Sequence, residues 1–369
     1  MNKPFDGVYK DKKVLITGHT GFKGSWLSLW LSSLGANVYG YAQPPVTDPS
    51  LFEHLKLAGS LHHEVADICD IDRFRKSIKA IQPDIIFHLA AQSLVRESYN
   101  HPLDTVMVNT MGTVNVLEAV RLEKLSPAIV LITTDKCYDN REWLYGYKET
   151  DALGGYDPYS ASKGAAEVLI ASWRNSFFNP GRLSEHGVRV ASARAGNVIG
   201  GGDWAKDRIV PDCIRDLQKT GIIQVRNPYA TRPWQHVLEP LGGYLKLGSK
   251  LLEVNDSALH EYCEAFNFGP LISSNKNVGA LVNKIIQVWG SGSWKSLSLE
   301  KAGHEASLLH LSIDKAYHKL KWLPQWNFEE TVSYTVDWYK ALTEDPSGII
   351  DFTAGQIQAY EERLMNATV

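Results

Sequence analysis

The feature that most constrains this chain is a regular alternation of short apolar runs and helical segments over its first half. The apolar runs have the length of buried strands, and bulky residues recur between them at helical spacing. The predicted strands are residues 13–17, 37–41, 64–68, 84–89, 128–133 and 188–193, and the predicted helices are 25–34, 72–81, 109–123 and 160–173. This order predicts an α/β fold with a Rossmann-type, doubly wound parallel sheet and right-handed crossovers.

The alternation breaks after about residue 195. Turn clusters occur at 200–204 and 227–229, and helical stretches resume at 240–254 and 278–289. We therefore expect a smaller C-terminal lobe that binds the substrate and is partly interleaved with the first domain. The predicted division gives 1–195 with about 232–262 to the Rossmann-type domain, and 196–231 with about 263–369 to the lobe.

Bulk composition excludes several classes of function. The 369 residues carry a net charge of −3, so no surface for nucleic acid or for an anionic membrane is expected. The apolar runs are too short for a transmembrane helix, and the polar N-terminus lacks the apolar core of a signal peptide. The cysteines have no paired metal-ligand spacing, which predicts reduced thiols in a cytoplasmic protein and no metal site: Cys69, Cys137, Cys213 and Cys263.

A glycine-rich turn follows the first predicted strand and precedes the first helix. Its three glycines have the spacing G-x-x-G-x-x-G, which lets backbone amides approach a pyrophosphate at the positive end of a helix. The lysine inside this turn either touches the pyrophosphate or is solvated. The predicted dinucleotide-binding turn comprises Gly18, His19, Gly21, Phe22, Lys23 and Gly24.

The second predicted strand ends without an acidic residue for a ribose 2′-hydroxyl and without an arginine for a 2′-phosphate. The motif therefore does not decide between NAD and NADP. Other residues at strand ends or helix starts are predicted to line the cofactor, with the aspartate near its adenine and the small residues leaving room along the sheet edge: Asp67, Ile68, Leu89, Ala90, Ala91, Gln92, Asn109 and Thr133.

Tyr159 and Lys163 carry the first candidate chemistry. Four residues apart on a predicted helix, the phenol and the ammonium share one face. A neighbouring ammonium favours phenolate, so we expect Lys163 to lower the pKa of Tyr159 and make it a base. With the glycine turn, this pair indicates oxidation of an alcohol by a nicotinamide cofactor.

Thr134, Asp135 and Lys136 follow the fifth predicted strand, where open α/β sheets bind ligands. The Thr134 hydroxyl is suited to hold a substrate alcohol near Tyr159. Asp135 is a candidate acid and Lys136 a candidate base, which indicates a second reaction after oxidation. The alternative interpretation of the Asp-Lys pair is an ordinary surface turn.

Five motifs occur in one order along the chain: Gly18-x-x-Gly21-Phe22-x-Gly24, Leu89-Ala90-Ala91-Gln92, Thr133-Thr134-Asp135, Tyr159-x-x-x-Lys163 and Arg194-x-x-Asn197-x-x-Gly200. Together they resemble the extended short-chain dehydrogenase/reductases that act on nucleotide sugars. Residues 134–138, 201–204 and 232–237 are similar to the 4,6-dehydratase branch that acts on CDP-glucose. The related dTDP-glucose enzymes have glutamate where Lys136 stands.

The resemblance implies a closed redox cycle with NAD that yields a 4-keto-6-deoxy sugar and water, and a place in deoxysugar synthesis for bacterial surface polysaccharides such as lipopolysaccharide O-antigen. It assigns Tyr159 to the C4 hydroxyl proton, Lys163 to the nicotinamide ribose and Thr134 to the C4 oxygen. It leaves Lys136 as the candidate C5 base and Asp135 as the acid at C6. The implied substrate-binding residues are Asn197, Arg208, Arg232 and Gln235.

Two other functions share part of this pattern. A nucleotide-sugar 4-epimerase keeps the turn, Tyr159 and Lys163, but has no use for an acid and a base at 135 and 136. A cofactor-sensing protein on an inactive dehydrogenase fold commonly loses Tyr159 or Lys163. For either arginine, Arg208 or Arg232, a structural ion pair is an alternative to diphosphate binding. Surplus apolar residues on helices 109–123 and 160–173 further predict a homodimer or homotetramer.

Overall fold

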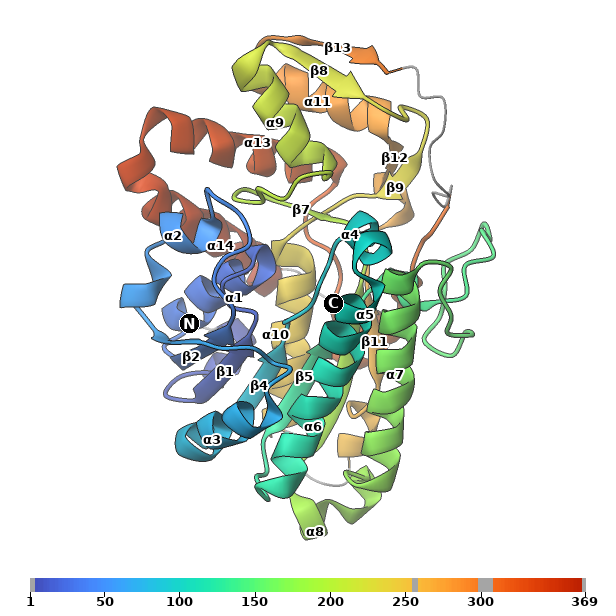
Figure 1. Cartoon of the computed structure of the whole chain (residues 1–369). Coiled ribbons are helices and arrows are strands. Elements are labelled where there is room, and N and C mark those ends of the chain that lie inside the picture. The colour runs from blue at the N-terminus through green and yellow to red at the C-terminus, as the bar shows by residue number, and fades with distance from the viewer. Residues whose placement is uncertain (1–3, 254–257, 298–307, 367–369) are drawn as a thin grey trace.

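A seven-stranded parallel sheet forms the centre of the computed structural model, which describes residues 4–253, 258–297 and 308–366 (Figure 1). Its strand order is β11-β6-β5-β4-β1-β2-β3, so the chain starts in the middle and winds outward in both directions. The strands are β1 (Lys13–Thr17), β2 (Asn37–Ala42), β3 (His62–Val65), β4 (Ile85–His88), β5 (Ala128–Ile132), β6 (Arg189–Ala195) and β11 (Ala265–Phe268).

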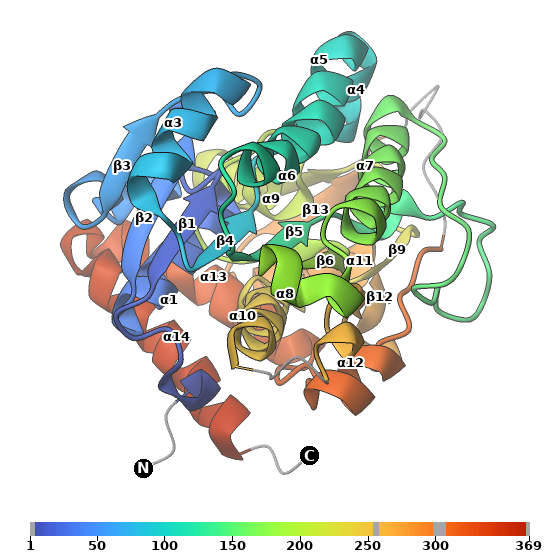
Figure 2. The ribbon, with the colours of Figure 1, turned by 90° about the horizontal axis from the view of Figure 1, so that it is seen from below.

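Helices cover both faces of this sheet, as Figure 2 shows from below. One face carries α3 (Ile71–Ile81), α6 (Gly112–Leu122) and α7 (Pro158–Ser176), and the other carries α1 (Phe22–Ser33), α10 (Leu238–Glu253) and α14 (Ile349–Asn366). Alternate side chains of each strand point to opposite faces: Leu15 lies in the core under α3 and α6, and its neighbours Val14 and Ile16 lie in the core under α1 and α10. This double burial explains why the strands read as continuous apolar runs.

The smaller lobe stands over the carboxyl ends of the strands, at the top of Figure 1. It contains three two-stranded sheets: β7 (Val198–Ile199) with β10 (Gln235–His236), β9 (Thr231–Pro233) with β12 (Asn275–Asn277), and β8 (Ile222–Val225) with β13 (Ser293–Ser296). Its helices include α9 (Ile209–Lys219), α11 (Val278–Trp289) and α13 (Phe328–Glu344).

Shorter elements complete the described chain. The α-helices are α2 (Leu51–His54), α4 (Val95–Asn100), α5 (Pro102–Val106), α8 (Leu183–His186) and α12 (Asp314–Leu320), and a π turn, Met107–Met111, joins α5 to α6. The 3₁₀ turns are Pro4–Gly7, Leu57–Gly59, Asp135–Cys137, Pro180–Arg182, Leu259–Glu261, Ile272–Ser274 and Pro346–Gly348. None of the described helices is long and apolar enough to cross a membrane.

The predicted fold class is confirmed, and the six predicted strands all lie in the sheet. The third strand is wrong in its bounds, because β3 ends at Val65 and Asp67 lies beyond it. The seventh strand, β11, was not predicted, although it pairs with β6 in the large sheet. The predicted helix 240–254 begins two residues earlier as α10, and its last residue, Val254, lies outside the described residues. The predicted division into two lobes stays a prediction.

Candidate active site

The glycine-rich turn lies between β1 and α1, and two of its glycines have no room for a side chain. Gly18 has φ +76°, and a Cβ there would lie 2.7 Å from the backbone N of Ala90. A Cβ on Gly24 would lie 2.1 Å from the carbonyl oxygen of Gly18. Gly21 is the N-cap of α1, and no side chain caps the first turn. The first backbone amides of α1 can therefore donate hydrogen bonds to an anion, and the turn fits the pyrophosphate of a dinucleotide.

His19 fills the space at the end of β2, on the adenosine side of the predicted cofactor site. Its Nε2 and His63 Nδ1 share a hydrogen bond of 2.7 Å, and burial, with the charge of His63, lowers the pKa of His19 to about 3. A Cβ on Gly40 would meet the His19 ring at 2.3 Å, which explains the glycine in this strand. A neutral, hydrogen-bonded imidazole pair therefore lies beside the strand end that lacks an acidic residue.

Asp67 and Ile68 follow β3 at the same edge of the sheet. Asp67 accepts hydrogen bonds from Gln43 Nε2 at 2.9 Å and from the backbone N of Cys69 at 2.8 Å. The Ile68 side chain is buried and faces Gly112 at the start of α6. The carboxylate of Asp67 is thus held in place within the chain.

The segment after β4 is tied to α7 through Asn109. The Asn109 amide accepts from the backbone N of Gln92 at 2.9 Å and donates to the Gln92 carbonyl and to Ser162 Oγ, both at 3.0 Å. Ser162 Oγ in turn donates to the carbonyl of Tyr159. Leu89, Ala90 and Ala91 line the sheet edge before Gln92. Asn109 therefore holds the segment after β4, which is predicted to line the cofactor, against the turn of α7 that carries Tyr159.

Thr134, Asp135 and Lys136 form the first turn after β5. Thr134 Oγ1 donates to Asp135 Oδ1 at 2.9 Å and accepts from the backbone N of Lys136 at 3.3 Å. The side chain of Asp135 is buried, and its Oδ2 has no hydrogen-bond partner in the described chain. Lys136 Nζ lies 3.9 Å from Asp135 Oδ1, and its side chain is 32% exposed. A buried acid with one open oxygen and a half-exposed amine are therefore placed side by side.

Tyr159 and Lys163 lie on the buried face of α7, one turn apart. Burial raises the pKa of Tyr159 to about 12, with Asp135 adding to the rise, while a hydrogen-bonding contact with Thr134 and the charge of Arg208 oppose it. The prediction of a lowered Tyr159 pKa is thus wrong for the protein alone, because desolvation of the phenol outweighs the Thr134 hydrogen bond and the charge of Arg208. Burial likewise lowers the pKa of Lys163 to about 8.

A buried ion pair lies one turn beyond Lys163. Glu167 accepts from Arg194 Nη2 at 2.8 Å, from Ser192 Oγ at 2.9 Å and from Thr133 Oγ1 at 2.5 Å. Burial opposes ionisation of Glu167, yet Arg194 and these hydroxyls leave its pKa below the usual range. Thr133 thus orients Glu167 and joins β5 to α7. Glu167 was not predicted from sequence. Its position four residues after Lys163, on the same face of the helix, could have indicated that it lies at the site.

Lys23 reaches from the glycine-rich turn to α10. It is half-buried, and its Nζ donates to the Tyr244 hydroxyl on α10 at 3.3 Å and lies 5.7 Å from the centre of that ring. Burial, with the charges of Arg208 and Lys163, lowers the pKa of Lys23 to about 7, although Asp135 opposes the shift. Whether Lys23 touches the pyrophosphate or is solvated stays a prediction. Tyr244, another missed residue, is 221 positions away and has no local sequence signal.

Arg208 is the N-cap residue of α9 and reaches from the lobe to the sheet edge. Its guanidinium donates to Asp203 Oδ2 at 2.9 Å and to Ser93 Oγ at 2.9 Å, and the charge of Asp203 raises its pKa. The charge of Arg208 also lowers the pKa of Tyr159, in opposition to burial. Asp203 and Ser93 were not predicted as partners of Arg208; Asp203 is only five positions away, whereas Ser93 is 115 positions away and is brought there by the fold.

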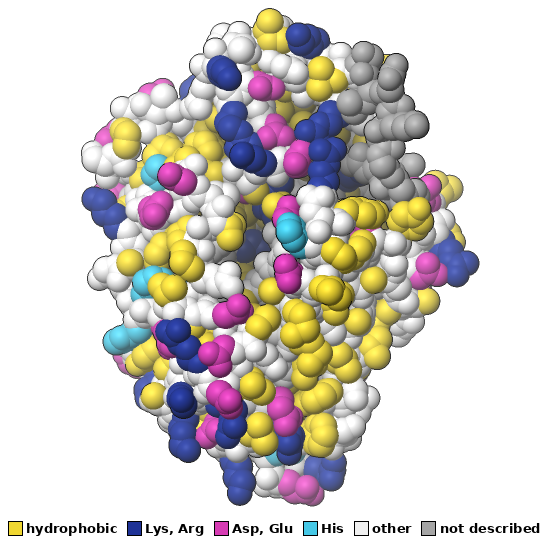
Figure 3. Space-filling model, viewed as in Figure 1, with side chains coloured by type: hydrophobic (Ala, Val, Ile, Leu, Met, Phe, Trp, Pro, Cys, Tyr) yellow, Lys and Arg dark blue, Asp and Glu magenta, His cyan; other side chains and the backbone are white. Residues whose placement is uncertain are grey.

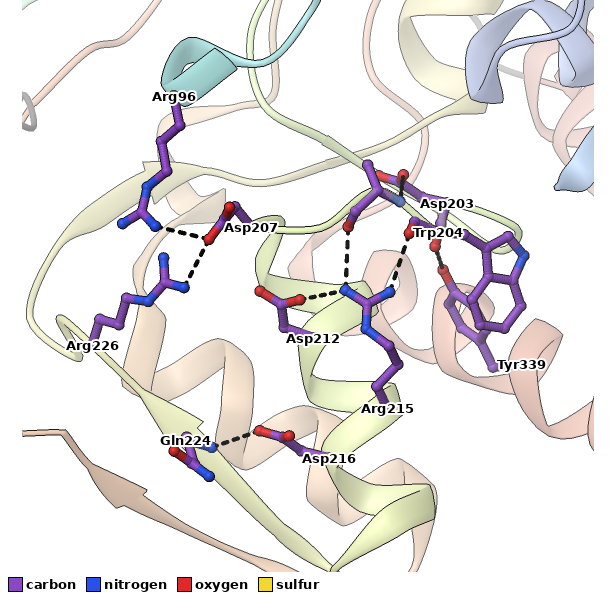
Figure 4. Close-up of polar contacts among 11 residues, drawn as sticks. Arg96, Asp203, Trp204, Asp207, Asp212, Arg215, Asp216, Gln224, Arg226 and Tyr339 are labelled. Atoms are coloured by element: carbon purple, nitrogen blue, oxygen red, sulfur yellow. Dashed lines mark hydrogen bonds and ion pairs between the residues drawn. The ribbon is translucent and has the colours of Figure 1, made fainter. Parts of the chain in front are cut away.

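A polar network holds the loop that precedes Arg208 (Figure 4). Tyr339 Oη donates to the Asp203 carbonyl at 2.6 Å, and Arg215 Nη1 donates to the Trp204 carbonyl at 3.1 Å. Asp207 Oδ1 accepts from Arg96 at 2.8 Å and from Arg226 at 2.7 Å. Figure 4 shows these contacts coming from α4, α9, α13 and the end of β8 toward one loop. The loop is therefore anchored on both sides of the site.

The other predicted substrate-binding residues lie where the lobe meets the sheet. Asn197 is half-buried between β6 and β7. Gln235 on β10 is buried; its Nε2 donates to the Phe268 carbonyl at 3.3 Å, and its Oε1 has no hydrogen-bond partner in the described chain. Arg232 on β9 donates to the Thr231 carbonyl at 2.8 Å. In the space-filling view this face is hollowed below the lobe, with Lys and Arg atoms inside the hollow (Figure 3).

The arrangement supports proton transfer from an alcohol beside a dinucleotide, followed by acid-base catalysis at a neighbouring carbon. Thr134, Asp135, Tyr159 and Lys163 are all buried, at the carboxyl ends of the strands. In the described residues, 4–253, 258–297 and 308–366, no three His, Cys, Asp or Glu side chains gather to hold a metal ion. The four cysteines are free thiols.

Known proteins are similar to this chain in sequence. A CDP-glucose 4,6-dehydratase from Salmonella typhimurium is 49% identical over 333 residues, covering 90% of this chain and 92% of that protein. A dTDP-glucose 4,6-dehydratase from Shigella flexneri is 23% identical over 392 residues, covering 95% of this chain and 98% of that protein.

Solved structures share the fold at lower identity. The dTDP-glucose 4,6-dehydratase DesIV from Streptomyces venezuelae, with NAD and TYD bound, superimposes with a TM-score of 0.75 at 20% identity, covering 91% of this chain and 99% of that one. The UDP-glucose 4-epimerase of Thermotoga maritima gives a TM-score of 0.74 at 19% identity, covering 90% and 99%. The family model for GDP-mannose 4,6 dehydratase matches residues 15–335, and the chain therefore belongs to this family of nucleotide-sugar dehydratases within the short-chain dehydrogenase/reductases.

Proposed function

We propose that this protein converts CDP-glucose to CDP-4-keto-6-deoxyglucose and water. The Salmonella typhimurium relative, at 49% identity over 90% of the chain, supports the substrate. The observation that carries the reaction is the turn after β5, where a buried aspartate with an open oxygen and a half-exposed lysine lie beside the catalytic tyrosine. A 4-epimerase does not need either group.

NAD is the cofactor that we propose, and the residues fit it. The turn of Gly18, Gly21 and Gly24 would hold the pyrophosphate, and Lys163 the nicotinamide ribose. NAD, when bound, supplies the hydride acceptor for C4 of the sugar and the hydride donor for C6. Because hydride leaves and returns within one catalytic cycle, no second substrate is needed.

The first step removes the proton of the C4 hydroxyl. Thr134 Oγ1 holds the sugar oxygen, and Tyr159 accepts its proton as the C4–H bond breaks. The positive charge of Arg208 eases formation of the phenolate, in opposition to burial. Lys163 and the ion pair of Glu167 with Arg194 keep α7 in the orientation that this transfer needs.

The second step eliminates water across C5 and C6. The C4 ketone acidifies the C5 proton, which passes to the Lys136 amine, and the electron pair forms the C5–C6 double bond. Asp135 gives its proton to the C6 hydroxyl, which leaves as water. When C6 is reduced, Lys136 returns the proton to C5, and Asp135 is reprotonated as Tyr159 gives up the proton taken from C4. Atoms and charge balance over the cycle.

The diphosphate of the substrate meets the cations of the lobe. Arg208 and Arg232 supply forked donors suited to phosphate oxygens. Asn197 lies between β6 and β7, and Gln235 Oε1, which has no partner in the described chain, can accept a hydrogen bond from a substrate hydroxyl. Arg208 is already oriented by Asp203 and Ser93, which lowers the entropy cost of binding an anion.

Incubation of the purified protein with CDP-glucose and NAD, followed by mass spectrometry and NMR, tests this function. The expected product has lost one water and carries a ketone at C4. An unchanged mass with a new sugar configuration would indicate epimerisation. An unchanged substrate would contradict both enzymatic functions and favour a cofactor-sensing protein.

We also propose that the protein forms a homodimer, or a homotetramer built from it, in the cytoplasm. Apolar side chains are exposed on α5, the π turn and α7, on the face shown in Figure 3: Leu103, Val106, Met107, Met111, Val168 and Phe177. Val114, Leu117 and Val120, which belong to the surplus apolar residues of the predicted helix 109–123, are instead buried in the core. An apolar patch on paired helices suits a two-fold interface.

A further inference from the structure

One buried ion pair reaches both ends of the turn of residues 134–137, which carries the candidate acid and the candidate base. The pair joins Glu167 on α7 to Arg194 on β6, and these side chains are only 2% and 5% exposed. Thr133, just before the turn, donates from Oγ1 to Glu167 at 2.5 Å. Tyr138, just after the turn, accepts from Arg194 Nη1 at 2.8 Å. The two partners of a single ion pair are therefore linked to the two ends of one short segment.

Tyr138 is a fixed end of this turn, because its hydroxyl both accepts and donates a hydrogen bond. Besides accepting from Arg194, the buried Tyr138 hydroxyl donates to Asn267 Oδ1 on β11 at 2.7 Å. Arg194 Nη1 also donates to the Glu149 carbonyl at 3.1 Å. Moving this end of the turn would leave buried donors and acceptors without partners, which costs free energy. The end of the turn is thus held in one position.

Two glycines place α7 and the end of β6 directly against the turn. Gly164 follows Lys163 on α7, and a Cβ there would lie 3.3 Å from the carbonyl oxygen of Cys137. A Cβ on Gly196, just after β6, would lie 2.7 Å from Asp135 Oδ2, the oxygen that has no hydrogen-bond partner in the described chain. The direction of the Asp135 carboxyl group therefore depends on how closely the turn is held against these two elements.

We infer that Thr133 and Tyr138 are positioning residues for the elimination step, through which the pair of Glu167 and Arg194 holds the turn in register with the sugar. Elimination needs a proton donor and a proton acceptor of this turn within hydrogen-bond reach of the groups at C6 and C5. The base of the oxidation step, Tyr159, stands on α7 and does not belong to the turn. Loosening the turn should therefore slow elimination more than oxidation. This inference rests on the proposed dehydratase function.

Three variants test it, and each removes one hydroxyl from the surroundings of the ion pair. Thr133→Val and Tyr138→Phe break a link to the turn and keep both charges of the pair. Ser192→Ala is the matched control, because Ser192 on β6 donates to the same Glu167 carboxylate, at 2.9 Å, from outside the turn. Rapid mixing with CDP-glucose and NAD follows the appearance and the decay of reduced cofactor in a single turnover, and quenched samples are analysed by mass spectrometry.

Wild type and Ser192→Ala should show the same ratio of decay rate to appearance rate. In Thr133→Val and Tyr138→Phe this ratio should fall by about tenfold or more, because a displacement of about 1 Å can cost about 10²-fold in rate. The sugar nucleotide that accumulates should be the 4-keto compound with its C6 hydroxyl still present. A contribution to stability alone predicts a lower denaturant midpoint with an unchanged ratio.

An unchanged ratio in either Thr133→Val or Tyr138→Phe would overturn the inference, and so would an equal fall in Ser192→Ala. Accumulation of the dehydrated sugar would also overturn it, since hydride return would then be the slowed step. If neither turn variant folds, Arg194→Lys decides, because lysine keeps the charge but lacks the fork that reaches both Glu167 and Tyr138. A lower ratio in Arg194→Lys supports the inference, and an unchanged ratio overturns it. A wild type that forms neither reduced cofactor nor product would instead contradict the proposed function.

Discussion

Asp135→Asn and Lys136→Met should separate elimination from oxidation. Both residues act only after the C4 ketone exists, whereas Tyr159 acts before it. Each variant should therefore still oxidise C4 and accumulate reduced cofactor, while product release falls. General acid-base catalysis contributes about 10²–10⁴-fold, so we expect turnover to drop by that factor, which corresponds to about 3–5 kcal/mol of transition-state stabilisation.

The structure also sets the stability cost of the two changes. Asp135→Asn would keep the hydrogen bond from Thr134 but would place an amide N–H₂ where Asp135 Oδ2 has no partner in the described chain. A buried donor without an acceptor costs about 1–3 kcal/mol of the free energy of unfolding. The Lys136 side chain is 32% exposed, so solvent screens its ion pair, and Lys136→Met should cost about 1 kcal/mol or less.

The deciding assay follows solvent deuterium at C5 during a single turnover, with rapid-mixing absorbance for the reduced cofactor. Lys136→Met should slow C5 exchange by about 10²-fold or more, while Asp135→Asn should preserve it. Asp139→Asn and Lys148→Met, exchanges of the same type on the following loop, serve as controls and should retain wild-type turnover. Normal C5 exchange in Lys136→Met would remove this lysine from the role of base.

Four further expectations follow from the same structure. Tyr159→Phe should lower turnover by about 10²-fold or more, with a modest effect on sugar binding, as measured by steady-state kinetics. A turnover near that of wild type would contradict the role of Tyr159 as the base. Added NAD should raise the activity of purified protein, because β2 ends without an acidic residue to hold the adenosine ribose; full activity without NAD, or a preference for NADP, would contradict this. Burial raises the pKa of Glu239 on α10 to about 7, above its unfolded value, so its ionisation should cost up to about 3 kcal/mol of stability as pH rises from about 4.5 to 7. Denaturant unfolding at pH 5 and pH 8 should show this loss in wild type and not in Glu239→Gln. The same pH dependence in both proteins would refute it. Leu103→Glu with Met107→Glu should give monomers in light scattering while the exposed control Val46→Glu should not, and dimers in the double variant would exclude this face.

Much of this molecule can be predicted from local sequence. Strands buried on both faces produce continuous apolar runs, so six of the seven sheet strands were found. The glycines of the first turn are recognisable because their backbone contacts exclude a Cβ, as at Gly18 and Gly24. Tyr159 and Lys163 share a helix face by their spacing alone. Thr134, Asp135 and Lys136 follow a predicted strand at the edge where parallel sheets bind ligands.

Tertiary structure alone decided what these residues face. β11 is four residues long and, in the described chain, pairs with β6 at one edge of the sheet. Lys23 reaches Tyr244 across 221 positions, and Arg208 reaches Ser93 across 115. The pKa of Tyr159 depends on how deeply α7 is buried, and a motif spacing carries no information on burial. Local spacing determines which side chains share an element, whereas solvent exclusion and contacts between distant segments determine their charge state and partners.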